Sequence, residues 1–84
     1  MAELDTEARD RLRDSAFAYI DRDGERHLPI HDAAHVRNAV ARFDQTEFES
    51  KSARYAAATR ILAAAKRHDI EVDRDSEVAR AARS

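Results

Sequence analysis

The stretch "AFAYIDRDGERHLPIHDAAHVRNAVARF", residues 16–43, contains the change from strand patterning to helix patterning that decides the fold. Its first half holds aromatic and β-branched residues on both sides of Asp23-Gly24. That pair favours a two-residue type I′ turn, because Asp and Gly tolerate the positive φ that both central positions need. In its second half the apolar residues recur at helical spacing. The stretch therefore predicts a β-hairpin followed by a helix, with strands at about 16–22 and 25–30 and the helix at about 33–43.

Counting outward from a two-residue turn gives a register for the hairpin. In this register charges of opposite sign face each other beside the turn, which is the favourable cross-strand arrangement. Pro29 cannot donate a backbone hydrogen bond, so the second strand is expected to keep an open edge. A lone hairpin is barely stable in water, so helices must cover its aromatic face. The expected partners are Arg22 with Glu25, Asp21 with Arg26, Ile20 with His27, Tyr19 with Leu28, and Phe17 with Ile30.

Helical spacing also appears on both sides of this stretch. Leu4, Ala8 and Leu12 recur every four residues and predict an N-terminal helix at about 5–13. A second helical run at about 50–68 has a candidate buried stripe of Tyr55, Ala58, Ile61, Leu62 and Ala65. The expected fold class is therefore α+β, with an N-terminal helix, a β-hairpin and a two-helix pair packed on the hairpin. We expect a single small domain with an ordered core over about 5–72, and a short helix or a frayed end over 73–84.

The composition excludes several classes of protein. The chain has 84 residues and no cysteine, so it can form neither a disulfide framework nor a thiolate zinc site. No apolar run approaches the roughly 18–20 residues that span a bilayer, and the charged N-terminus lacks the apolar core of a secretory signal. We expect a cytoplasmic protein without membrane partners. The formal net charge is only -2, and the 13 arginines accompany 18 alanines, a usage typical of GC-rich genomes.

Three segments, "SAFAYI", "GERHLPIHDAAHVRNAVARF" and "ILAAAKRHDIEV", carry a resemblance to a known family. Over about residues 12–72 the chain resembles small bacterial domains of unknown function that share an LPDSAFA segment and a PIHDxAHxRNAxAR segment. Members of that family stand alone or are attached to phage-type head-maturation proteases and other prophage proteins. The resemblance implies a shared architecture and no catalytic residues. Two positions depart from the pattern: Arg13 replaces a proline, and Asp69 replaces a glycine suited to a left-handed helix cap.

His27, His31 and His35 are spaced four residues apart, which raises the question of a metal site. A zinc-binding helix can present two histidines at this spacing. Asp32 is the natural N-cap of the following helix, however, so His31 should precede the first helical turn. His27 should lie on a strand face opposite Tyr19. The sequence therefore predicts no metal site and no cofactor, with the three histidines kept as the candidates for one.

A structural role explains the same residues more economically. Asp32 can accept hydrogen bonds from the amides at the start of the helix, and His35 can return one toward the Asp32 backbone, as in a capping box. His31 would then fix the strand-to-helix corner. A pH-sensitive corner or a binding surface remains the alternative, because histidine titrates near neutral pH. The expected structural junction is Pro29, His31, Asp32 and His35, and the expected turn is Asp23 and Gly24.

Catalysis has little support, because neither a nucleophile–base set nor a glycine-rich phosphate loop is recognisable in a chain with one glycine. We therefore expect a non-enzymatic module that binds another protein or itself through an open strand edge and the alanine-rich helix. The alternative is nucleic-acid binding by the helices at 33–43 and 50–68, although the negative net charge argues against it. The candidate residues for that surface are Arg37, Arg42, Arg54, Arg60, Lys66 and Arg67.

Overall fold

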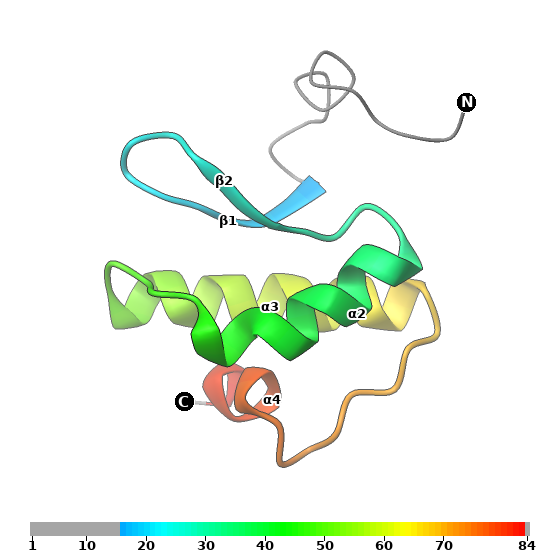
Figure 1. The fold of residues 1–84 in the computed structure, drawn as a ribbon. Coiled ribbons are helices and arrows are strands. Elements are labelled where there is room, and N and C mark those ends of the chain that lie inside the picture. The colour runs from blue at the N-terminus through cyan, green and yellow to red at the C-terminus, as the bar shows by residue number, and fades with distance from the viewer. Residues whose placement is uncertain (1–15, 84) are drawn as a thin grey trace, which may run out of the picture.

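The computed structural model describes residues 16–83, and within them it has the predicted α+β class (Figure 1). The helix predicted at 5–13, with the departure at Arg13, lies outside the described residues. An antiparallel hairpin is followed by three α-helices and one short 3-10 helix, η2. The elements are β1 (Phe17–Ile20), β2 (Arg26–Pro29), α2 (Ala33–Arg42), η2 (Phe43–Gln45), α3 (Lys51–Arg67) and α4 (Glu77–Ala82).

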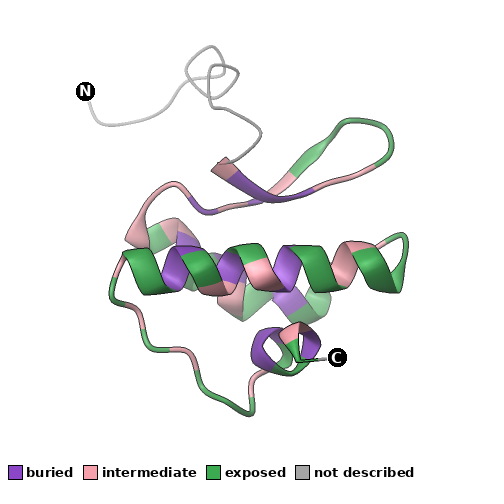
Figure 2. Cartoon of the chain, turned by 180° about the vertical axis from the view of Figure 1, so that it is seen from behind, coloured by how far each residue is buried: buried purple, intermediate pink, exposed green. Residues whose placement is uncertain are grey.

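The elements form three layers around one core. The hairpin covers one side of the helical pair, with β1 against α3 and β2 against α2 (Figure 1). Helix α4 packs on α3 on the side away from the hairpin. Buried residues of α3 alternate with exposed ones around its axis, which places the core between the layers (Figure 2). The largest fully buried side chains are Val36, Phe43, Ile61 and Val78.

The hairpin register differs by one residue from the predicted one. Asp21 Oδ1 accepts from the amides of Asp23 and Glu25, and the amide of Gly24 donates to the carbonyl of Asp21. Gly24, at φ +84°, closes a three-residue loop as a bulge, a geometry that an Asp-Gly pair fits as well as a type I′ turn. The slip moves every cross-strand pair. The observed partners are Ile20 with Arg26, Tyr19 with His27, and Phe17 with Pro29.

This slip overturns the predicted charge pairs at the turn. Asp21 faces Glu25 across the loop, and its carboxylate meets His27 rather than Arg26. Arg22, expected opposite Glu25, pairs with Glu49 instead, with Nε 3.1 Å from Oε2. Because a one-residue slip exchanges the faces of a strand, the expectation that His27 and Tyr19 lie on opposite faces is also wrong.

The backbone conformation of Leu28 keeps its side chain in the core despite the register slip. Strict alternation after His27 would turn Leu28 to the other face of the hairpin. Leu28 has φ +57°, an uncommon conformation for so large a side chain, and this breaks the alternation of β2. Its side chain is buried in the core, as the sequence predicts, although the backbone reaches that result differently.

The helix boundaries follow their caps. Asp32 is the N-cap of α2, and Ser50 is the N-cap of α3, with its hydroxyl accepting from the amide of Ala53 at 3.0 Å. The buried stripe of α3 is made of Ala57, Ala58, Ile61, Ala64 and Ala65. The predicted stripe is therefore wrong at Tyr55, which is 47% exposed. Small alanine side chains on this face allow the neighbouring elements to pack closely on α3.

The end of α3 uses the left-handed cap that the sequence predicts at Asp69. This residue has φ +56°, and the amide of Ile70 donates to the carbonyl of Ala65 at 2.8 Å, as in a Schellman motif. Ile70 and Val72 then pack against the core. For residues 73–84 the sequence left a helix and a frayed end open, and the structure has α4 there, capped by Ser76.

Candidate functional site at the strand-to-helix corner

The described residues hold two clusters in which histidine meets carboxylate. The tip cluster, at the hairpin loop, consists of Asp21, Glu25 and His27. The corner cluster, between β2 and α2, consists of His31, Asp32 and His35. In each cluster one ligand-type atom from every residue lies within 4.8 Å of the others. The three histidines of the fourfold spacing are therefore divided, with His27 in one cluster and the other two together.

The tip cluster is organised around the Asp21 carboxylate. Its Oδ1 holds the loop by accepting two backbone hydrogen bonds, and its Oδ2 lies 2.9 Å from His27 Nε2. The His27 bond, followed by the bond from the Glu25 amide, keeps the pKa of the Asp21 carboxyl below its ordinary value. The His27 ring stacks on Tyr19 at a centroid distance of 5.4 Å. The hydrogen bonds described for this cluster therefore hold the hairpin loop against the strands.

The corner cluster begins with the N-cap of α2. Asp32 Oδ1 accepts from the His35 amide at 2.8 Å, which stabilises the first helical turn. The same oxygen lies 2.8 Å from His35 Nδ1. The sequence predicts a bond from the His35 ring to the Asp32 backbone, whereas the structure has the ring bonded to the Asp32 carboxylate. The backbone bond first and the ring bond second keep the pKa of the Asp32 carboxyl below its ordinary value.

His31 is brought onto the first turn of α2 although it precedes the helix. The extended backbone of Asp32, at φ -146° and ψ 171°, separates His31 from the helix, yet the His31 and His35 rings lie 4.3 Å apart between centroids. His31 Nε2 lies 3.5 Å from Asp32 Oδ2. Its Nδ1 is buried and has no hydrogen-bond partner among residues 16–83. His31 therefore precedes the first helical turn, as the sequence predicts, and its ring nevertheless contacts that of His35.

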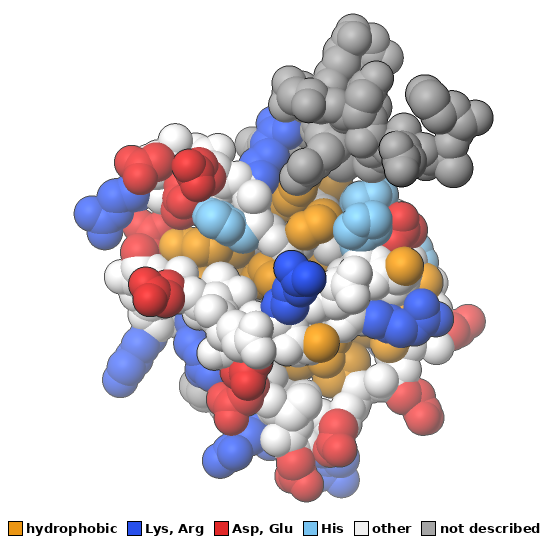
Figure 3. Space-filling model, viewed as in Figure 1, with side chains coloured by type: hydrophobic (Ala, Val, Ile, Leu, Met, Phe, Trp, Pro, Cys, Tyr) orange, Lys and Arg blue, Asp and Glu red, His pale blue; other side chains and the backbone are white. Residues whose placement is uncertain are grey.

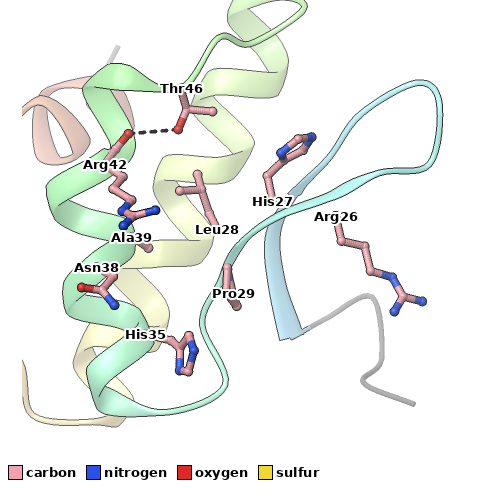
Figure 4. A pocket seen from close by; sticks show the side chains of 9 residues that line it. All are labelled: Arg26, His27, Leu28, Pro29, His35, Asn38, Ala39, Arg42 and Thr46. Carbon is pink, nitrogen blue, oxygen red and sulfur yellow. Dashed lines mark hydrogen bonds between the residues drawn. The ribbon is translucent and has the colours of Figure 1, made fainter. Parts of the chain in front are cut away.

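A groove runs from the corner cluster toward the tip cluster, between β2 and α2 (Figure 4). Its volume is about 480 Å³. His27 and His35 lie toward opposite ends, the Arg42 side chain runs along α2 toward Asn38, Leu28 lies toward the helices, and Arg26 points away from α2. The space-filling view shows histidines on both sides of a central basic side chain on this face, with apolar atoms between them (Figure 3). The lining residues are Arg26, His27, Leu28, Pro29, His35, Asn38, Ala39, Arg42 and Thr46.

Comparison with known protein families gives one match. Residues 2–75 match the model of a family of unknown function, DUF6582. The chain belongs to this family. The resemblance to a domain family of unknown function is thereby confirmed, and it covers slightly more of the chain than the sequence patterns indicate. No curated protein and no solved structure gives a significant match.

The candidate nucleic-acid residues of this DUF6582 domain have different surroundings. Arg42 lines the groove, whereas Arg37 borders a shallow depression together with Asp69 and Glu71. Arg54 is held by Glu77 of α4, with Nη2 3.1 Å from Oε2. Arg60 follows Arg54 by six residues, so the two side chains leave α3 in directions about 120° apart around the helix axis. Lys66 and Arg67 lie in the last turn of α3.

Sequence reasoning missed the groove of the DUF6582 domain. Asn38 and Thr46 carried no signal as functional residues, since their importance depends on the position of β2 beside α2. His27 and Asp21 could have been paired from the sequence, had the Asp-Gly turn been treated as a three-residue loop. Among residues 16–83, no helix combines the length and the apolar composition that crossing a membrane would require.

Proposed function

We propose that the chain is a non-enzymatic interaction module, and that it binds an extended acidic segment of a partner protein in the groove between β2 and α2. One observation carries the proposal. The chain contains 17 acidic and 15 basic residues. The described residues that line the groove nevertheless include Arg42, His27 and His35, with neither Asp nor Glu among them. Arg26 also lines the groove, but its guanidinium lies over the Phe17 ring and points away from α2 (Figure 4). The guanidinium of Arg42 therefore favours a ligand that carries carboxylates.

Arg42 is the residue best placed to recognise such a ligand. Its side chain extends along the groove (Figure 4), and its backbone carbonyl accepts from the Thr46 hydroxyl at 2.9 Å. A guanidinium can bind a carboxylate through two parallel hydrogen bonds, a geometry that lysine does not reproduce. Asn38 adds a side-chain amide to the groove lining. The groove can therefore offer several donors to one acidic segment.

The apolar part of the groove supports binding of an extended chain. Leu28, Pro29 and Ala39 contribute apolar surface to the lining between the polar groups. A volume of about 480 Å³ falls within the usual range of ligand sites, roughly 300–1,000 Å³. Pro29 has no backbone N–H, so side chains rather than a continuous strand ladder would have to provide specificity. The resemblance to modules attached to phage head-maturation proteases makes a phage or prophage protein the first partner to test.

Fluorescence anisotropy with labelled peptides tests this proposal. The probes are short peptides with Asp or Glu at alternate positions and apolar residues between them, and the controls carry Asn or Gln at the same positions. We expect the acidic peptides to bind and the amide peptides to bind at least about tenfold more weakly, since a hydrogen bond to a charged group is worth roughly 1.5–3 kcal/mol. Equal binding of both sets contradicts the proposal.

Two variants with the same charge change locate the site. Arg42→Gln removes the guanidinium from the groove, whereas Arg37→Gln removes one from the same helix outside the groove. Arg42→Gln should weaken acidic-peptide binding roughly tenfold or more, and Arg37→Gln should leave it nearly unchanged. Equal losses would mean general charge attraction and would contradict the groove. Binding of duplex DNA in preference to acidic peptide would instead favour the nucleic-acid alternative, and concentration-dependent sedimentation without peptide would favour self-association.

A further inference from the structure

We infer that the corner cluster of His31, Asp32 and His35 is a binding site for a divalent transition-metal ion of the zinc class. The inference does not rest on peptide binding in the groove, although His35 also lines the groove. It rests on the distances within the cluster, on the chemistry of its three side chains, and on the way the fold holds them. The second and third points differ from the corresponding features of the tip cluster.

The distances in the corner cluster suit a shared ion. Ligands held at about 2.0–2.1 Å from one metal lie roughly 2.9–3.4 Å from one another in tetrahedral or octahedral geometry. Asp32 Oδ1 lies 2.8 Å from His35 Nδ1, and Asp32 Oδ2 lies 3.5 Å from His31 Nε2. One ligand atom from each residue is within 4.8 Å of the other two. Small side-chain rotations would therefore bring all three residues onto one ion.

The side-chain chemistry selects the class of ion. Two imidazoles and one carboxylate form a nitrogen-rich set that suits Zn²⁺, Ni²⁺, Cu²⁺ and Fe²⁺, whereas Mg²⁺ and Ca²⁺ prefer oxygen ligands. An imidazole ligand must be neutral and must offer a lone pair. The ion would therefore occupy the lone pair of His35 Nδ1 in place of the contact with Asp32 Oδ1, and the neutral ring would keep its one proton on Nε2.

The fold holds the three side chains before any ion binds. The N-cap bond from the His35 amide fixes the Asp32 carboxylate at the start of α2. The His31 side chain is only 21% exposed, and its ring packs against that of His35 at an interplanar angle of 32°, which restricts it. Preorganised ligands lose less conformational entropy on binding. The Asp32 and His35 side chains are 51% and 40% exposed, so an ion could enter from solvent and keep water in its remaining positions.

The helix dipole opposes a cation at this end of α2, because the amide groups there carry partial positive charge. The Asp32 carboxylate compensates for that effect, since it lies at the N-cap and accepts from the His35 amide. The His31 nitrogen that faces Asp32 is Nε2, at 3.5 Å from Oδ2, so Nε2 is the atom that would bind an ion together with Asp32.

The tip cluster provides an internal control. It has a single imidazole and two carboxylates, and Asp21 Oδ1 is already bonded to two backbone amides. Glu25 is exposed, and its side chain carries no described constraint comparable to the cap at Asp32. A transition metal should therefore prefer the corner cluster, although both clusters bring three potential ligands together.

The test is calorimetric titration of the full 84-residue chain, freed of metal by chelator, with Zn²⁺ and separately with Co²⁺ followed by visible absorption. We expect one ion per chain. His31→Asn and His35→Gln should each weaken Zn²⁺ binding by more than the roughly 10- to 100-fold that loss of an outer-shell partner costs. His27→Gln, which removes the imidazole of the tip cluster, should leave the affinity unchanged.

Asp32→Asn separates ligation from folding. Asn caps helices about as well as Asp, so the variant should stay folded while losing the anionic ligand and much of its Zn²⁺ affinity. Thermal melting without metal checks that every variant is folded, and Zn²⁺ should raise the melting temperature of the wild type more than that of the corner variants. The inference is overturned if the wild type binds no Zn²⁺, if only His27→Gln weakens binding, or if no single variant changes the affinity.

Discussion

The tip cluster and the corner cluster are built from the same kinds of side chain but do different work. In each, an aspartate accepts hydrogen bonds from backbone amides and from a histidine ring. At the tip these bonds close a solvent-exposed loop, and the ring of the single histidine, His27, stacks on Tyr19. At the corner the aspartate caps a helix that buries Val36 and Ala39, and two histidine rings contact each other beside it. The equal spacing of the three histidines therefore does not determine which of them come into contact. The backbone conformation of Asp32, the N-cap residue, places His31 against His35.

The largest expected effect that separates the clusters is that of Asp32→Ala. It removes the N-cap acceptor of α2, and loss of such a cap costs about 1–2 kcal/mol in the free energy of unfolding. Asp32→Asn should lower the free energy of unfolding by only a few tenths of a kcal/mol, because the amide oxygen can accept the same bond. Urea unfolding followed by circular dichroism measures both variants. Equal losses for Ala and Asn would mean that charge, rather than capping, is what Asp32 contributes.

Gly24→Ala tests the hairpin loop by its backbone rather than by a side chain. No described atom lies within 4 Å of the position that a Cβ would take. Any loss of stability in this variant would therefore come from the backbone conformation and not from a steric clash. Placing alanine at φ +84° should cost about 1 kcal/mol. Chemical denaturation of the variant provides the value. A neutral or stabilising result would show that the loop does not hold Gly24 in the left-handed region, and the one-residue register slip would then be in doubt.

His35→Gln should have a smaller effect on stability than either change. The N-cap bond uses the His35 backbone amide and survives, and the ring's bond to Asp32 is half exposed. Exposed ion pairs are worth less than about 1 kcal/mol, so we expect a loss of about 0.5 kcal/mol or less. A loss above about 2 kcal/mol, more than a cap normally contributes, would assign His35 a buried structural role and remove the contrast between the clusters.

The smallest effect expected is the pH dependence that Asp21 contributes. Its carboxyl pKa is lowered in the folded state by His27 and the loop amides, so its contribution to stability is complete above the ordinary pKa of about 4 and is lost as pH falls through the folded value. The stability difference between wild type and Asp21→Asn should therefore shrink as the pH falls from about 6 to about 3. Thermal melting across that range measures it. A difference that grows toward acid pH would contradict the role of the ionised carboxylate.

Much of the fold was predictable because local signals determine it. The cap at Asp32 and the apolar spacing after it predict α2 to within one residue of its observed end. The burial of Leu28 and Ile30 followed from their apolar character. In both cases, a residue's own chemistry or a short repeat was enough. The left-handed conformation of Asp69 was instead implied by the family resemblance, which places a glycine at that position.

The register and the site were not predictable in the same way. Asp-Gly fits a two-residue turn and a three-residue loop equally well, and Gly24 has a positive φ in both. The type I′ turn also needs a positive φ at Asp23, which Asp23 does not have in the structure. Tyr55 has the right spacing for the core but the wrong angle on α3, which packing against α2 and α4 determines. The approach of His31 to His35 depends on the backbone angles of Asp32, which residue type alone does not fix.

We infer that the strand-to-helix corner, and not the hairpin tip, binds a transition-metal ion through its histidines. The most direct test is NMR observation of the imidazole nitrogens and carbon-bound protons of His27, His31, His35 and His68 during addition of Zn²⁺. We expect the His31 and His35 signals to change together up to one equivalent, while those of His27 and His68 stay in place. A first change at His27, or a gradual parallel change of all four rings, would contradict it.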